Sequence, residues 1–428
     1  MSSVIQSVRA RRVWDSRGRP TVEVEVSLSS GMTGRGVAPA GASRGSREAV
    51  DLRDGGPRLG GFDVQKALGH VRDRIRPAIL GMPVTDLLRI DQRLMALDAS
   101  DTRAHIGGNA LIATSFALLD ATARDMHMPV WQYLAQGKPV RLPLPEIQIF
   151  GGGAHAGHRV DIQDFLVMPV GAESFDEAMV MTAEVYRAAG EIMEERGRRA
   201  GVADEGGWWP DFASNEEALE TLTRSIDRAG YQYDQIAISL DIAASEFGRK
   251  DFYQLGLEGR HYGTEEWINV LSGWLDRYPI LSIEDPVAED DEPGMQQFTA
   301  RWGDKIQIVG DDYLVTRADL VEAAAARGAC NAVLLKPNQV GTVSETAAAM
   351  HAADRHGWGK VVSARSGETE DVSIVHLAVG WDTGQLKVGS FARSERMAKW
   401  NEALRIEESL GAQAIYAGRS ALPSCLRR

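Results

Sequence analysis

Residues 279–312 read PILSIEDPVAEDDEPGMQQFTARWGDKIQIVGDD, a stretch with two short apolar runs and a segment of helical length between them. Each apolar run is followed at once by carboxylates. Short apolar runs that alternate with helix-length amphipathic segments are typical of parallel strands joined by crossover helices. The same alternation extends on both sides of this stretch, through IAISLDI, NAVLLKPN, KVVSARS and LKVGS. It predicts a parallel α/β barrel in the later part of the chain.

Polar side chains end most of these apolar runs. The carboxyl ends of barrel strands face one mouth, so residues that are distant in sequence meet there. We therefore expect convergence of Asp241, Glu284, Asp311, Lys336, Arg365, Ser366 and Lys387.

The first part of the chain has a different pattern. TVEVEVSL (residues 21–28) alternates as a strand does, and helical periodicity follows from about residue 64 to 134. The proline-containing stretch KPVRLPLPEIQIF, residues 138–150, indicates a boundary. The fold class is therefore predicted as α/β, with an α+β domain over residues 1–137 and a barrel over residues 138–428.

Composition limits the classes of function. The 428 residues include 47 Lys and Arg against 60 Asp and Glu, a net charge of −13, which argues against nonspecific binding of nucleic acid. Cys330 and Cys425 alone support no disulfide framework. The N-terminus lacks the apolar segment of a signal peptide, and no apolar run approaches the roughly 18 residues of a membrane span. We expect a cytoplasmic protein without a membrane partner.

Three carboxylates at successive strand ends suggest a metal site. Asp241, Glu284 and Asp311 would repel one another in one place unless a hard divalent cation lay between them, and oxygen ligands suit Mg²⁺. Each acid taken alone could equally cap a helix or lie in a solvated loop. The three together predict Mg²⁺.

Two lysines follow later strands of the series. Near a metal and another cation, Lys336 or Lys387 would have a lowered pKa and could act as a general base, while its neighbour held a substrate anion. The alternative is that either lysine extends from its strand end to solvent.

Other candidates lie in loops. Glu205, in GVADEGGWWPDF, would have a raised pKa if the tryptophans formed pocket walls, and could then protonate a leaving hydroxyl; the alternative is an ordinary turn acid. His155 could contact its glycine loop or a substrate. Arg365 and Ser366 suit a phosphate or phosphonate, and the loop GASRG could act as a lid that brings Ser43 to a second metal.

These strings resemble the enolase family over nearly the whole chain. The matching motifs are DSRGRPTVEVEV, GASRG, FGGGAHAG, DIQDFLVMPVGAESFDEAM, ADEGG, LDIAASEF, SIEDP, VGDD, SGETED, TGQLKVG and RSERMAKWNEALRIEESLG. The resemblance implies an N-terminal lid domain and a (β/α)8 TIM-like barrel. It also implies a small anionic phosphorus-containing substrate and two Mg²⁺ ions held by Asp241, Glu284, Asp311 and, on lid closure, Ser43.

The resemblance also implies individual roles. Lys336 would be the base that removes a C2 proton, and Glu205 the acid that assists loss of a C3 hydroxyl, which gives an enolpyruvate. Lys387 would face the substrate carboxylate, Arg365 and Ser366 the phosphoryl group, and His155, Gln163 and Asp164 would line the pocket, Asp164 with a catalytic role. Glu23 and Arg405 match positions that pair across a homodimer interface. A higher homo-oligomer is the alternative assembly.

Several pocket positions depart from the family pattern. Ala364 replaces a histidine, Arg44 adds a charge to the lid, and Asp164 is shorter than the usual glutamate; Pro337 predicts a bulge after Lys336, and Phe391 replaces a proline. More space and an added cation near phosphorus predict a larger, more anionic substrate, as in carboxyphosphonoenolpyruvate synthase of phosphonate natural-product pathways. The alternatives are a housekeeping enolase of glycolysis and a noncatalytic enolase-like binding protein.

Overall fold

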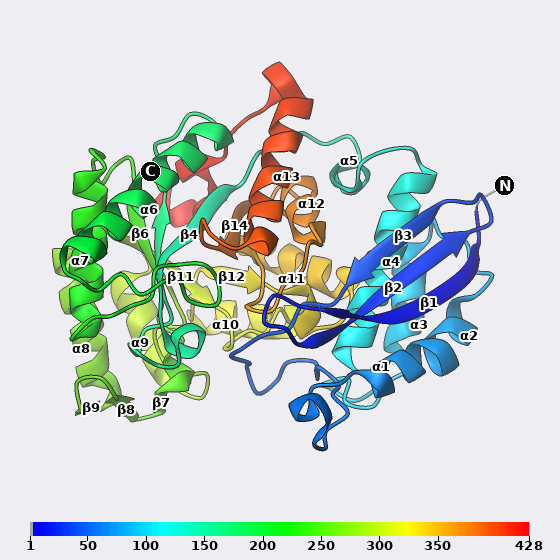
Figure 1. The fold of residues 1–428 in the computed structure, drawn as a ribbon, viewed down its shortest axis with the longest axis horizontal. Helices are drawn as coiled ribbons and strands as arrows, with labels where there is room; N and C mark the ends of the chain where they lie inside the picture. Colours follow the sequence, from blue (N-terminus) through cyan, green and yellow to red (C-terminus); the bar gives the residue numbers. More distant parts are fainter. Residues whose placement is uncertain (1–2, 428) are drawn as a thin grey trace.

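The computed structural model describes residues 3–427, which form a sheet-and-helix part beside a barrel (Figure 1). The first part begins with an antiparallel sheet of order β1-β2-β3, formed by Ile5–Trp14, Pro20–Leu28 and Thr33–Val37. The alternating run at β2 buries Val22, Val24 and Val26 completely. This apolar face packs against a long helix, α4, at Gly108–Asp125.

Small residues permit this close packing. A side chain at Gly34 would place a Cβ 2.1 Å from the backbone nitrogen of Ala121 in α4, so only glycine fits. Below the sheet in Figure 1 lie α1 Gln65–His70, α2 Arg76–Ile79 and α3 Leu87–Met95, with the π-helical turn Val71–Ile75 between α1 and α2. Helix α5, Val130–Ala135, lies above the sheet and packs against α12.

A closed eight-stranded barrel follows, as the sequence predicts. In chain order its strands are β4 Leu144–Gly151, β5 Asp164–Met168, β6 Ala237–Asp241, β10 Ile280–Glu284, β11 Gln307–Gly310, β12 Ala332–Leu335, β13 Gly359–Ser363 and β14 Gly384–Gly389. Strand β14 pairs with β4 in parallel and closes the ring.

The expectation of a wholly parallel barrel is wrong at one strand. Strand β5 is antiparallel to both β4 and β6. Residues 152–163, between β4 and β5, contain one short 3-10 turn and no α-helix, and a parallel connection needs a longer crossover. The amino end of β5, which carries Asp164, therefore lies beside the carboxyl end of β6 at Asp241.

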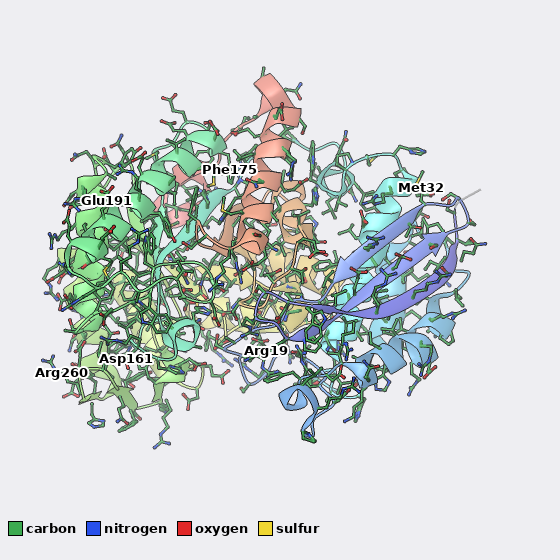
Figure 2. The ribbon with its side chains drawn as sticks, in the orientation of Figure 1. Arg19, Met32, Asp161, Phe175, Glu191 and Arg260 are labelled. Carbon is green, nitrogen blue, oxygen red and sulfur yellow. The ribbon has the colours of Figure 1, made fainter. Side chains whose placement is uncertain are left out.

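Helices cover the outside of the barrel (Figure 1). They are α6 Phe175–Glu195, α7 Asn215–Arg228, α8 Thr264–Arg277, α9 Glu292–Trp302, α10 Ala318–Arg327, α11 Val343–Arg355, α12 Ser373–Gly380 and α13 Ser394–Leu410. A small sheet, β7 Gly248–Arg249, β8 Phe252–Leu255 and β9 Arg260–Tyr262, lies at one edge. In Figure 2, Met32 and Arg260 mark opposite ends of the molecule.

Pro337 does not produce the bulge that the sequence suggests. Strand β12 ends at Leu335, and Pro337 begins a 3-10 turn, Pro337–Gln339. Lys336 is thus the last residue before the turn, and the proline removes no donor from the strand ladder. No helix in residues 3–427 is long and apolar enough to cross a membrane.

One buried acid lies where the two parts meet. Asp91 of α3 accepts hydrogen bonds from Ser115 Oγ of α4, at 2.8 Å, and from Ser344 Oγ of α11, at 2.6 Å. Burial raises the pKa of Asp91 to about 6, although both serines partly offset the effect. Between the unfolded pKa and about 6 the folded state binds the extra proton, so this group lowers stability as pH rises through that window.

Asp91→Asn should therefore match the wild type in stability near pH 4 and exceed it above pH 6, by about 3 kcal/mol for roughly two pKa units. An amide is compatible with the site, because Ser115 Oγ can accept from it. Urea denaturation of both proteins from pH 4 to pH 8 measures the difference. Asp234→Asn, at an exposed position, is the control and should show no pH-dependent gain. A constant or reversed difference for Asp91→Asn would contradict the burial argument.

Candidate active site

The strand ends of the barrel meet at one cavity beneath the loop of residues 41–45. Asp241 and Glu284 are the last residues of β6 and β10, Asp311 and Lys336 directly follow β11 and β12, and Lys387 lies in β14. The cavity is lined by Gly41, Ala42, Ser43, His155, Gln163, Asp164, Glu205, Asp241, Lys336, Ser363, Ala364, Arg365, Ser366, Lys387 and Val388. The structure thus brings together most of the residues that the sequence singles out; Glu284 and Asp311 contact the lysines but are not in the cavity lining.

Lys387 joins the first two acids. Its Nζ lies 2.8 Å from Asp241 Oδ2 and 2.8 Å from Glu284 Oε2, and 3.5 Å from Asp164 Oδ2. Burial lowers the pKa of Lys387, but the nearby carboxylates outweigh it and hold the pKa well above its usual value. Lys387 is therefore charged at neutral pH.

Lys336 forms an ion pair with Asp311, the third predicted metal ligand. Its ammonium donates to Asp311, and Gln339 Nε2 donates to the other oxygen of Asp311 at 2.8 Å. Burial lowers the pKa of Lys336, and Arg365 and Lys387 also lower it, but Asp311 and Glu284 prevail and the net pKa is raised. The pKa of Lys336 is raised because Asp311, one of the acids predicted as metal ligands, contacts it directly. The lowered pKa predicted for a lysine beside bound Mg²⁺ stays a prediction.

The donor set fits a hard divalent cation. Glu284 Oε1 and Gln163 Oε1 are buried and have no hydrogen-bond partner among the described residues. Burial and the neighbouring Asp241 raise the pKa of Glu284 well above its usual value, so an added positive charge would stabilise its carboxylate. Oxygen ligands of this kind suit Mg²⁺.

The tightest acidic groups differ from the predicted triad. Over residues 3–427, two sets of three side chains have ligand atoms within 4.8 Å of one another: His155, Asp164 and Glu205, and Asp285, Asp311 and Asp312. Sequence reasoning missed Asp285 and Asp312, although the paired acids of SIEDP and VGDD could have indicated them. Asp285 accepts the backbone N–H groups of Asp311 and Asp312 at 2.9 and 2.8 Å, so it orders the turn that carries Asp311.

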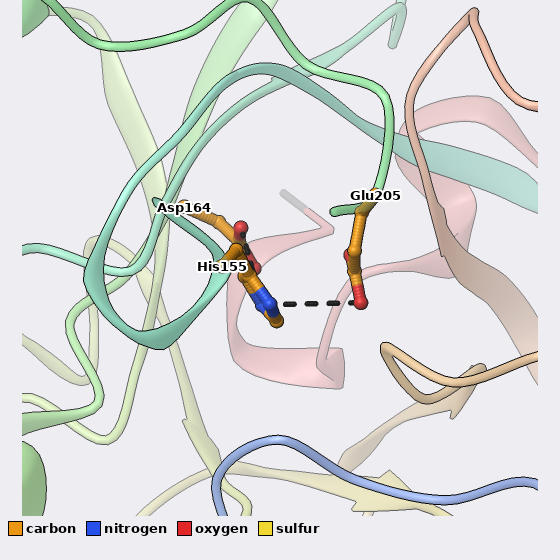
Figure 3. Close-up of side chains that lie close together, drawn as sticks. All are labelled: His155, Asp164 and Glu205. Atoms are coloured by element: carbon orange, nitrogen blue, oxygen red, sulfur yellow. Dashed lines mark ion pairs between the residues drawn. The ribbon is translucent and has the colours of Figure 1, made fainter. Parts of the chain in front are cut away.

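His155 lies between two carboxyl groups (Figure 3). Its Nε2 is 3.8 Å from Asp164 Oδ1 and 3.8 Å from Glu205 Oε1. Burial raises the pKa of Asp164 to about 6. Burial also acts to raise the pKa of Glu205, but His155, Arg396 and the two lysines outweigh it, and the net pKa is lowered.

The expectation of a raised Glu205 pKa between tryptophan walls is therefore wrong. Trp208 stacks on Tyr186, with ring centroids 4.7 Å apart, and neither Trp208 nor Trp209 lines the cavity. Sequence reasoning missed Arg396, whose side chain is completely buried and lies 3.8 Å from Glu205 Oε1. Its position in the motif RSER was the available signal.

The anion-binding candidates touch the loop above the cavity. Arg365 is 3% exposed, and its Nη2 donates to the carbonyl oxygen of Ser43 at 3.0 Å. Ser366 Oγ accepts from Ala42 N at 2.6 Å. Arg44, in contrast, is exposed and does not line the cavity.

Comparison with known proteins identifies the family. Residues 5–134 match the family model of the enolase N-terminal domain, and residues 139–424 match that of the enolase C-terminal TIM barrel domain. The chain belongs to the enolase family. It is 47% identical to "Enolase 1" of Desulfitobacterium hafniense (strain Y51) over 419 residues, which cover 97% of this chain and 96% of that protein. The chain is accordingly a lyase of the enolase superfamily.

Two features of this enolase-family protein bear on substrate and assembly. Ala364 lines the cavity next to Arg365. Within the chain, Glu23 pairs with Arg11, and Arg405 pairs with Glu402 at 2.9 Å. The contact between Glu23 and Arg405 across an enolase dimer stays a prediction.

Proposed function

We propose that this chain removes the C2 proton of 2-phosphoglycerate, or of a close analogue, and eliminates the C3 hydroxyl to form an enolpyruvate. The observation that carries this proposal is the cavity in which Lys336 and Lys387, both buried, face Glu205, His155 and Asp164 below Arg365 and Ser366. Anion-binding groups, a candidate base and a candidate acid thus surround one space.

Asp241, Glu284 and Asp311 would hold Mg²⁺, and Ser43 would join a second ion when the loop closes. Bound Mg²⁺ would supply positive charge that stabilises the carboxylate as it takes up negative charge on loss of the C2 proton. The partnerless oxygens of Glu284 and Gln163 support this assignment. Residues 1–137 would then act as the lid domain and residues 138–428 as the catalytic barrel.

The chain's own groups have complementary tasks in this proposal. Lys336 takes the C2 proton, for which it must first be neutral, and Lys387 stays charged opposite the substrate carboxylate. Glu205 donates a proton to the departing hydroxyl, for which it must first take up a proton, because its pKa is lowered within the chain. Asp164 and Glu205 have pKa values shifted in opposite directions beside His155, so Asp164 takes up a proton at a higher pH than Glu205 does. Gln163 and His155 orient the substrate between the acid and the base.

We further propose that the substrate carries a larger phosphorus group than phosphate, as in carboxyphosphonoenolpyruvate synthase. The small side chain of Ala364 supports this proposal, because it lies in the cavity lining next to Arg365 and occupies less of the cavity than the histidine of the family pattern would. Arg44 follows Ser43, the last cavity-lining residue of the loop, and would add positive charge to the site on closure. The alternatives are an ordinary glycolytic enolase, the activity that the name of the similar D. hafniense protein indicates, and a noncatalytic binding protein. We also propose a cytoplasmic homodimer.

Phosphorus NMR of reactions with Mg²⁺ and 2-phosphoglycerate, with and without cytidylyl-phosphonoformate, decides among these functions. The specialised enzyme should form a new phosphonate product only with the second compound. Rapid conversion of 2-phosphoglycerate alone to phosphoenolpyruvate would identify an ordinary enolase. No Mg²⁺-dependent turnover together with no Mg²⁺ binding would favour the binding protein.

Ala364→His tests the role of the small side chain at this position. An imidazole there should lower turnover with the larger co-substrate by about tenfold or more, because overpacking displaces the larger group. Turnover of 2-phosphoglycerate alone should stay the same or rise. Initial rates by phosphorus NMR measure both reactions, and Ala326→His, at an exposed position of α10, is the control. An equal loss in both reactions would show that the change damages the site in general.

A further inference from the structure

Glu48 follows the loop of residues 41–45, and its carboxylate lies against the end of that loop. It is 5% exposed and does not line the cavity. Glu48 Oε1 accepts from Gly45 N at 3.1 Å, from Gln339 Nε2 at 3.2 Å and from Arg365 Nη2 at 3.1 Å. Glu48 Oε2 accepts from Arg365 Nη1 at 3.0 Å. Glu48 is thus the acceptor in four hydrogen bonds from three residues.

One set of contacts fixes the orientation of the Arg365 side chain. Its guanidinium makes a two-point contact with Glu48, which sets the plane of the group. Arg365 Nη1 also donates to Asn338 Oδ1 at 3.0 Å, and Nη2 to the carbonyl oxygen of Ser43 at 3.0 Å. A Cβ at Gly41 would lie 2.1 Å from Arg365 Nη2, so the loop backbone also packs closely on the guanidinium. Arg365 is thus held in one orientation.

A second set of contacts connects Glu48 to Lys336, the proposed base. Gln339 donates to Glu48 and, at 2.8 Å, to Asp311 Oδ1, while Thr316 Oγ1 donates to Gln339 Oε1 at 2.6 Å. Asp311 in turn accepts from the ammonium of Lys336. One buried chain of hydrogen bonds therefore runs from the loop through Glu48 to both the anion-binding arginine and the lysine side of the cavity.

We propose that Glu48 is a positioning residue that holds Arg365 in its binding orientation and fixes the foot of the loop. A negative charge against Arg365 weakens its attraction for an anion, so the contact contributes through geometry. This inference rests on the proposed function for the identity of the anion. The orientation of Arg365 and the order of the loop are properties of the chain and can be measured without turnover.

Glu48→Gln is the first test, because it keeps the shape but places one amide N–H group against donors. We expect KM for 2-phosphoglycerate and the Kd of inorganic phosphate to rise by about tenfold or more, while kcat changes by less than about threefold. Glu48→Asp keeps the charge but shortens the reach, and should raise both constants similarly. Wild-type constants in Glu48→Asp would overturn the positioning role in favour of a charge effect.

The order of the loop gives a second readout. Hydrogen exchange of the peptide that covers residues 41–47 should be faster in Glu48→Gln, since Gly45 N loses its carboxylate acceptor. Glu322→Gln changes another Glu–Arg pair, with Arg355 on the barrel surface, and should leave exchange and phosphate binding unchanged. Unchanged exchange in Glu48→Gln would overturn the proposed link to the loop.

A double-variant cycle separates direct from indirect action. If Glu48 acts through Arg365, Glu48→Gln should cost little once Arg365→Gln is present, so the effects on phosphate Kd are not additive. Additive effects would overturn the proposal. If wild-type protein binds phosphate but turns over no 2-phosphoglycerate, the proposed function fails, while phosphate titration and hydrogen exchange still decide the role of Glu48.

Discussion

Replacing Lys336 with alanine is expected to lower kcat by about 10⁴-fold, the upper range for loss of a general base. Lys336 is buried, contacts Asp311 and lines the cavity. Among the described cavity residues, Lys387 is the one other lysine that could replace it as the base. Lys387 is held between Asp241 and Glu284, each 2.8 Å from its Nζ, and stays charged.

Exchange of the substrate's C2 proton with deuterated solvent tests the assignment separately from the overall rate. Lys336→Ala should lose exchange and product formation together. Lys360→Ala, which removes a lysine at the opposite end of strand β13, is the control and should keep both. Persistent exchange in Lys336→Ala would assign the base to another group.

Glu205→Gln should lower product formation by about 10³-fold and leave C2 exchange within about tenfold of wild type, because it removes the acid and spares the base. The amide can still contact His155 but cannot release a proton to a hydroxyl. Proton NMR of C2 exchange and phosphorus NMR of product follow the two steps in one sample.

Glu195→Gln, on the exposed end of α6, is the matched control and should behave as wild type. Equal loss of exchange and product in Glu205→Gln would contradict separate roles. A larger loss of elimination in Asp164→Asn than in Glu205→Gln would move the acid to Asp164, whose pKa of about 6 is the higher of the pair.

Alternating apolar runs and helical segments were sufficient to predict the barrel and the α+β part before it. The prediction holds because periodicity is a local property that burial imposes on every strand and helix. The direction of β5 was not predictable in this way, since an antiparallel strand has the same apolar pattern as a parallel one. Only the short connection between residues 152 and 163 distinguished it.

Convergence of strand ends followed from barrel geometry, so Asp241, Lys336 and Lys387 were found from sequence. The pKa shifts of the site residues could not be predicted from sequence in this way. The pKa of Glu205 depends on Arg396, which is 191 residues away along the chain, and that of Lys336 on its contact with Asp311. Glu48 was missed for the same reason, because its partners lie in three separate segments. Roles of these side chains stay predictions until the variants are measured.

Ring closure has a consequence for synthesis of the protein on the ribosome. Strand β4, the first of the barrel, pairs with β14, the last, through contacts such as Leu144 with Gln385. Until about 240 further residues have emerged, the nascent sheet has two open edges with unpaired backbone groups, which other chains can join. Chaperone capture during translation should therefore concentrate on chains that end before β14.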